Sequence, residues 1–91
     1  ENASGNNVET LYRMLDGRVE AMEFVVRPGS TNIIGVPLQQ LGLKKNLLVC
    51  SINRQGKIIT PTGQDTILEG DIVVVVTTHK GIRDLGDIVR Y

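Results

Sequence analysis

Side chains alternate between two faces on either side of the dipeptide Asp16-Gly17, and this alternation predicts a β-hairpin over residues 8–26. Asp-Gly is a strong turn signal, because both central positions of a two-residue hairpin loop need positive φ. A helix over residues 9–15 is the competing prediction for the first arm, since its apolar residues also stand at helical spacing.

Two further strands and their turn are predicted in the middle of the chain. The apolar stretch 47–53 suits a strand, residues 54–56 a turn, and residues 57–60 its antiparallel return. Pro61 ends that pairing because it has no backbone N–H to donate. Residues 72–78 form a continuous β-branched run, which predicts a strand buried on both faces.

Two helices complete the predicted elements. Pro37 suits a first helical position and Gly42 the position after the last, which predicts a short helix over residues 36–41. A last helix is expected to open at Thr78 or His79. Its apolar stripe would consist of Ile82, Leu85, Ile88 and Val89.

The order of these elements predicts an α+β domain with a small, largely antiparallel or mixed β-sheet, a short helix and a C-terminal helix. Its 91 residues suffice for one domain over residues 8–91. Residues 1–7 are polar and aperiodic, and we interpret them as a disordered tail that resembles the remnant of an expression tag. A chain this short has a marginal core, so we expect support from a partner subunit.

Charge and cysteine content exclude several classes of protein. Ten basic and ten acidic residues give a net charge of zero, which argues against nucleic-acid binding and against docking to anionic lipid. The longest apolar run, residues 72–76, is too short to span a bilayer. Cys50 is the single cysteine, so we expect neither an internal disulfide nor a thiolate zinc site, and we interpret it as a buried small hydrophobe.

Groups that could carry catalysis are sparse. The one histidine, His79, is far from Cys50 in sequence, and the glycine patterns that hold pyrophosphate are absent. Lys44-Lys45 is either a solvated pair or a contact for an anion. We therefore expect a binding or assembly module with no catalytic residues, no metal and no cofactor of its own, and not an enzyme.

An ordered series of short motifs runs through the chain. It consists of Gly17-x-x-Glu20-Ala21, Ile34-Gly35-x-x-Leu38-x-x-Leu41, Leu47-x-x-x-Ser51-Ile52-x-Arg54-x-Gly56-x-Ile58-Ile59-x-Pro61-x-Gly63 and Asp65-Thr66-Ile67-Leu68-Glu69-Gly70-Asp71-Ile72-Val73-Val74-Val75. This series resembles the TrkA-C domain, the C-terminal ligand-binding domain of the regulator-of-potassium-conductance type. The resemblance covers residues 8–91.

The resemblance implies a cytoplasmic regulatory domain of a Trk-type potassium uptake system. Such a domain binds a small effector, forms a homodimer and controls a membrane-embedded transporter, to which it is peripheral. The same domain type within another cation/proton antiporter or anion permease, or a purely structural dimerisation module, is the alternative.

The resemblance also implies a ligand site, because one branch of the family binds cyclic di-AMP at the dimer interface. Carried over by position, the candidate ligand-binding residues are Leu43, Lys44, Leu47, Leu48 and Pro61. That branch has arginine at the position aligned with Lys44 and asparagine near Leu47. A lysine lacks the planar, two-pronged donor geometry of arginine. The expected ligand is therefore a cyclic dinucleotide or another small effector.

Overall fold

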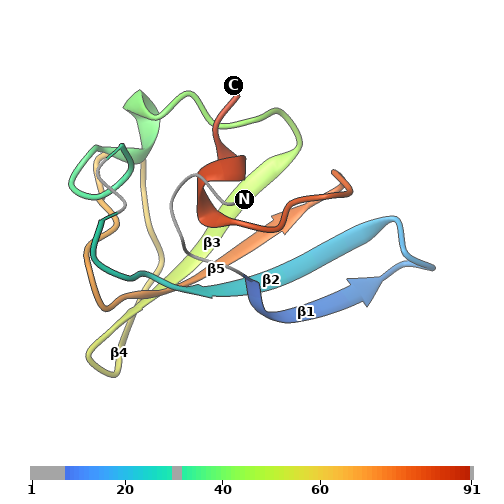
Figure 1. The fold of residues 1–91 in the computed structure, drawn as a ribbon, viewed down its shortest axis with the longest axis horizontal. Helices are drawn as coiled ribbons and strands as arrows, with labels where there is room; N and C mark the ends of the chain where they lie inside the picture. Colours follow the sequence, from blue (N-terminus) through green and yellow to red (C-terminus); the bar gives the residue numbers. More distant parts are fainter. Residues whose placement is uncertain (1–7, 30–31, 91) are drawn as a thin grey trace.

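A five-stranded antiparallel sheet organises the computed structural model, which describes residues 8–29 and 32–90 (Figure 1). The strands are β1 (Val8–Met14), β2 (Val19–Val25), β3 (Leu47–Arg54), β4 (Lys57–Ile59) and β5 (Ile72–Thr77), and the short 3₁₀ turns are η1 (Leu38–Gln40) and η2 (Leu85–Ile88). The strand order is β1-β2-β5-β3-β4, so β5 lies at the centre although it is last in sequence. The predicted tail, residues 1–7, lies outside the described residues.

The predicted hairpin is confirmed, and the alternative helix over residues 9–15 is wrong. β1 and β2 pair from Val8↔Phe24 to Met14↔Val19, with a bulge between Val8 and Thr10. The connecting loop contains four residues rather than two, because Leu15 and Asp16 also adopt positive φ before Gly17. Gln55-Gly56 is the tighter turn, with φ of 54° and 84° between β3 and β4.

The prediction of an α+β domain is wrong, because residues 8–29 and 32–90 contain no α-helix and the fold is mostly β. The predicted helix over 36–41 is reduced to the three residues of η1. Gly42 does follow it with a φ of 67°, as expected of a residue that ends a helix.

The predicted C-terminal helix is replaced by an irregular segment that ends in η2. Gly81 has a φ of 85°, which no right-handed helix contains. The η2 turn begins only after Asp84, whose side chain and that of Asp87 form a reciprocal capping box, and Val89 returns to extended backbone. The apolar residues Ile82, Leu85 and Ile88 are still buried. Their spacing therefore predicted their burial correctly, but it predicted a helix that the structure does not contain.

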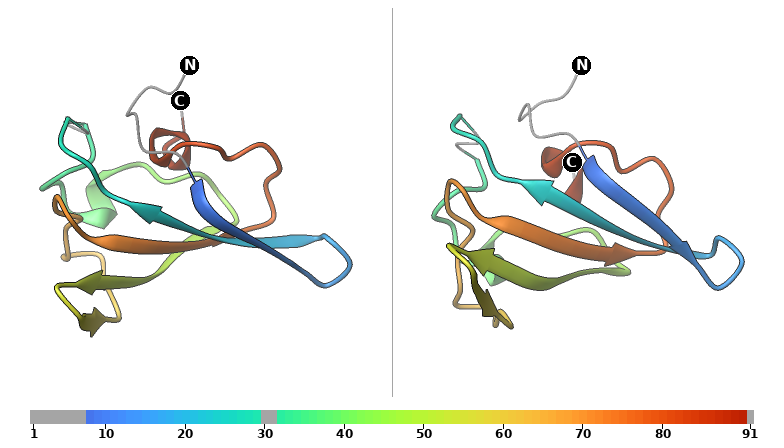
Figure 2. Two further views of the ribbon diagram at one scale, coloured as in Figure 1. Left: turned by 60° about the horizontal axis from the view of Figure 1, so that its bottom comes forward. Right: turned by 90° about the horizontal axis from the view of Figure 1, so that it is seen from below.

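One face of the sheet carries the core, and Figure 2 shows the C-terminal segment with η2 on that side. The strands contribute Met22, Phe24, Val49, Ile52, Val73 and Val75, and the connections contribute Val26, Ile33, Leu38, Leu41, Ile67, Ile82, Leu85 and Ile88. We call this the closed face. Apolar residues from short, irregular segments thus complete a core that two helices were expected to supply.

The opposite face, which we call the open face, contradicts the prediction that residues 72–78 are buried on both sides. Val73 and Val75 are fully buried, whereas Val74 and Val76 are half-buried. On neighbouring strands the register aligns Val76 with Ala21 and Leu48, and Leu48 is 62% exposed. A strand run of β-branched residues therefore faces two different environments here.

An ion pair fastens the turn before β5 to the end of β3. Arg54 donates from Nε and Nη2 to the two carboxylate oxygens of Asp71 at 2.9 and 2.8 Å, and Asp71 is 1% exposed. Asp71 also accepts from the Leu68 N–H at 2.8 Å, and Arg54 donates to the Thr66 carbonyl. The hydrogen bond to Asp71 raises the pKa of Arg54 above its usual value, so the guanidinium stays positively charged at physiological pH.

Candidate functional site

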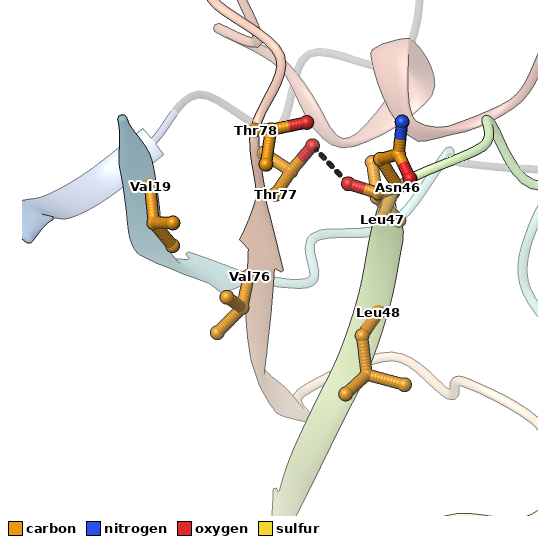
Figure 3. A pocket seen from close by; sticks show the side chains of 7 residues that line it. All are labelled: Val19, Asn46, Leu47, Leu48, Val76, Thr77 and Thr78. Atoms are coloured by element: carbon orange, nitrogen blue, oxygen red, sulfur yellow. Dashed lines mark hydrogen bonds between the residues drawn. The ribbon is translucent and has the colours of Figure 1, made fainter. Parts of the chain in front are cut away.

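A hollow of ≈ 370 Å³ lies at one end of the open face, where β2, β5 and β3 run side by side. It is lined by Val19, Asn46, Leu47, Leu48, Val76, Thr77 and Thr78. Figure 3 shows Val19, Val76 and Leu48 on three adjacent strands, with their side chains directed to the same side. The hollow is open to solvent and its lining is mainly apolar.

Hydrogen bonds fix the corner where β3 begins and β5 ends. The Thr77 hydroxyl donates to the Asn46 carbonyl at 2.8 Å (Figure 3), and the Thr78 N–H donates to the same oxygen at 3.2 Å. Asn46 has a φ of 59°, in the left-handed region that asparagine tolerates better than most residues. The position of the polar side of the hollow is therefore fixed by hydrogen bonds to the backbone carbonyl of Asn46.

This arrangement suits a flat ligand with one apolar face and a polar edge. Val19, Leu48 and Val76 offer an apolar floor, while Asn46 and Thr78 supply amide and hydroxyl groups that both donate and accept hydrogen bonds. Small-molecule sites commonly combine an apolar lining with a few fixed polar groups. A nucleobase has this combination of surfaces.

The structure divides the five predicted ligand residues into separate groups. Leu47 and Leu48 line the hollow. Leu43 instead forms a β-bridge with Val89. The side-chain ammonium of Lys44 donates to the Asp87 carbonyl, and the backbone N–H of Lys44 donates to the Ile88 carbonyl. Both residues thus hold the C-terminal segment within this subunit.

Pro61 lies elsewhere. It follows β4, whose last paired residue, Ile59, is opposite Ile52 in β3. Leu47 is five positions before Ile52 and pairs with Thr77 of β5 on the other side of β3. The sheet register therefore does not bring Pro61 next to Leu47 within one subunit.

Five of the residues that line the hollow were missed by reasoning from sequence: Val19, Asn46, Val76, Thr77 and Thr78. The alternation in residues 8–26 and 72–78 indicated which residues share a face of each strand. It did not indicate that β5 inserts between β2 and β3, because strand order is a long-range property. Asn46 carried a weak signal, since a polar residue directly before an apolar strand often marks a turn.

Cys50 occupies the bulge between Val49 and Ser51, and it is half-buried rather than buried as expected. Its burial raises the pKa of the Cys50 thiol, which disfavours the reactive thiolate. Among residues 8–29 and 32–90, no group of three or more His, Cys, Asp or Glu side chains lies close enough to hold a metal ion. No helix within the same residues is long and apolar enough to cross a membrane.

These features define a small β-sheet domain with one closed and one open face. The TrkA-C domain family matches residues 21–90, so the chain belongs to the TrkA-C domain family, as the resemblance indicated.

Two curated relatives of similar sequence come from Methanosarcina mazei. The Trk system potassium uptake protein TrkA homolog 2 is 35% identical over 72 residues, which are 79% of this chain and 16% of the relative. The Trk system potassium uptake protein trkA homolog 1 is 33% identical over 73 residues, which are 80% of this chain and 18% of the relative. The chain thus spans less than a fifth of the length of either relative.

Proposed function

We propose that this chain is the regulatory domain of a Trk-type potassium uptake protein. In this role it binds a small effector, pairs with a second copy and controls a membrane-embedded transporter from the cytoplasmic side, without catalysing a reaction. The observation that carries the proposal is the TrkA-C match over residues 21–90, together with relatives named as potassium uptake proteins.

The effector is proposed to bind in the hollow on the open face. Support comes from its mainly apolar lining beside the hydrogen-bonded corner at Asn46 and Thr77. Leu47 and Leu48, which the family resemblance assigned to the ligand site, both belong to this lining. A cyclic dinucleotide is the first candidate, and other nucleotides are the next.

The effector is tested with a thermal-shift screen of cyclic di-AMP, ATP, ADP and NADH, followed by calorimetry. A ligand that binds the folded state raises the apparent melting temperature by mass action. We expect Leu48→Asp to abolish the shift, because it places a charge on the apolar floor of the hollow. The matched control is Ile58→Asp, since Ile58 is 64% exposed against 62% for Leu48 and lies outside the hollow.

The role in transport is tested in cells that lack their own potassium uptake and express the whole protein that contains this domain. We expect Leu48→Asp to alter the rate of potassium uptake and Ile58→Asp to leave it unchanged. Equal uptake rates for both variants and the unmodified protein would contradict regulation through the hollow. If none of the nucleotides raises the melting temperature and potassium uptake is unchanged in both variants, the result would favour a purely structural module.

A further inference from the structure

The strand register arranges the open face in rows that run across the sheet. One row, which we call the apolar row, consists of Tyr12, Ala21, Val76 and Leu48. Its members Val76 and Leu48 line the hollow (Figure 3). The neighbouring row, which we call the polar row, consists of Thr10, Glu23, Val74 and Ser51. The polar row therefore places a carboxylate and two hydroxyl groups beside the hollow.

Glu23 is the one charged residue at the open-face positions of β1, β2, β3 and β5, all of which lie in the described part of the chain. It is half-buried, and its neighbours along β2 and on β5 are the apolar residues Ala21, Val25 and Val74. Its side chain has no hydrogen-bond or ion-pair partner within residues 8–29 and 32–90. A partly desolvated carboxylate without a partner is unfavourable. Because the fold gains no contact from this carboxylate, it is available to a ligand that donates hydrogen bonds.

Two cations flank the hollow at the end that lies away from the polar row. Arg18 and Lys45 directly precede Val19 and Asn46, which line the hollow. Both are exposed, and neither the guanidinium nor the ammonium has a partner among the residues that the structure describes. Arginine and lysine side chains are the usual contacts of phosphate groups. The open face thus has cations at one end, an apolar floor in the middle and a carboxylate beyond it.

This order of charges orients a nucleotide on the open face. Neighbouring rows are two residues apart along a strand, which is about 7 Å and similar to the length of a purine. A purine on the apolar row, with its phosphate towards Arg18 and Lys45, therefore presents its Watson–Crick edge to Glu23. The reverse orientation would bring the phosphate to the carboxylate, and the two negative charges would repel each other.

A carboxylate distinguishes the two purines at this edge. An ionised carboxylate only accepts hydrogen bonds, and its two oxygens can accept a parallel pair of them. Guanine has two adjacent donors there, the N1–H and the N2 amino group. Adenine has one donor, the N6 amino group, beside the acceptor N1, whose lone pair would face a carboxylate oxygen. A site that pairs with both donors of guanine is therefore expected to reject adenine.

We propose that Glu23 is the specificity-determining residue of the hollow and that the effector is a guanine nucleotide. The inference rests on the proposed function, in which the hollow binds a nucleotide, and it specifies the base. Thr10, the cross-strand neighbour of Glu23, has a hydroxyl that can donate to the remaining polar group of this edge, the guanine O6. Among cyclic dinucleotides, the site favours cyclic di-GMP over cyclic di-AMP.

Calorimetry with paired ligands tests the identity of the base. The chain is titrated with cyclic di-GMP and cyclic di-AMP, and then with GMP and AMP, because the members of each pair differ only in the base. We expect the guanine member of each pair to bind about tenfold more tightly or better, since adenine leaves a carboxylate oxygen opposed by a lone pair. Equal or tighter binding of the adenine members would overturn the inference.

Glu23→Gln tests the carboxylate through a change of preference. A glutamine amide both accepts and donates, so it complements the N6 amino group and N1 of adenine. The variant should weaken binding of cyclic di-GMP about tenfold and bind cyclic di-AMP more tightly than the unmodified chain does. Glu69→Gln is the matched control, because Glu69 is exposed, lies outside the hollow and loses the same charge. It should leave both dissociation constants unchanged, and circular dichroism checks that each variant is folded.

The outcomes separate this inference from the proposed function. If nucleotides bind with the same preference to the unmodified chain and to Glu23→Gln, the role of Glu23 is overturned while the nucleotide effector stands. If none of the four ligands binds, both the guanine assignment and the nucleotide effector are overturned. A preference for guanine that reverses in Glu23→Gln and persists in Glu69→Gln supports the inference, because a merely structural role of Glu23 would weaken both ligands alike.

Discussion

The two faces of β5 carry the same kind of residue and end in different environments. Val73 and Val75 are fully buried under η2 and the connections, while Val74 and Val76 lie half-buried on the open face. The connections bring apolar residues such as Ile67 and Leu85 to one side of the sheet. The difference shows that the covering layer, and not the strand sequence, decides which valines form the core.

The largest expected effect comes from placing a charge on each face of β5. Val75→Asp should prevent folding, because an unpaired carboxylate in the core costs more than about 4 kcal/mol. Val76→Asp, on the open face, should leave a folded protein that is about 1–2 kcal/mol less stable. Urea denaturation followed by circular dichroism measures both. A folded Val75→Asp variant would mean that the closed face admits water.

The next largest effect concerns the ion pair between Arg54 and Asp71. Asp71→Ala removes the buried partner of Arg54 and the acceptor of the Leu68 N–H, and should cost about 3–5 kcal/mol. Glu9→Ala removes an exposed pair with Arg27 and should cost less than about 1 kcal/mol. Equal losses for the two variants, measured by thermal denaturation, would contradict the assigned role of the buried pair.

Two leucines on opposite faces provide a comparison that involves no charge. Leu85→Ala opens a cavity at a fully buried position on the closed face and should cost about 2–5 kcal/mol. Leu48→Ala, on the open face, should change the free energy of unfolding by less than about 0.5 kcal/mol and weaken effector binding instead. Similar destabilisation by both would indicate that the open face is covered in solution.

The smallest expected effect is a pH dependence at Cys50. Burial raises the pKa of the Cys50 thiol in the folded protein. The contribution of this thiol to the free energy of unfolding is therefore complete below the pKa that the thiol has in the unfolded chain, and it decreases as the pH rises through the pKa of the thiol in the folded protein. Alkylation with iodoacetamide should show a midpoint above that of the urea-unfolded chain. Cys50→Ser, analysed by denaturation between pH 8 and 10, should lack the corresponding decrease in stability. Identical midpoints for folded and unfolded protein would contradict a shielded thiol.

Local patterns predicted the strands well and the helices poorly. The hairpin around Asp16-Gly17, the strand from Leu47 and the turn at Gln55-Gly56 depend on interactions between residues close in sequence. The stripe at Ile82, Leu85 and Ile88 correctly indicated burial. A 3₁₀ turn with extended flanks buries the same residues as a helix would, so periodicity alone could not distinguish the two.

The candidate site was predicted only in part. The family resemblance selected Leu47 and Leu48, which line the hollow, and also Leu43 and Lys44, which hold the C-terminal segment. The difference arises because these pairs are separated by the corner at Lys45 and Asn46, where the chain changes direction. Val19 and Val76 could not be assigned without knowing which strands are neighbours.

The sequence by itself determined the positions of the five strands, the turn at Gln55-Gly56 and the TrkA-C family, because these depend on short-range pattern and motif order. Tertiary structure alone decided that β5 lies between β2 and β3, that one face is closed and the other open, and that β1 is an accessible edge. The physical reason is that these properties depend on which distant segments cover a surface, and each segment's own residues are compatible with more than one such arrangement.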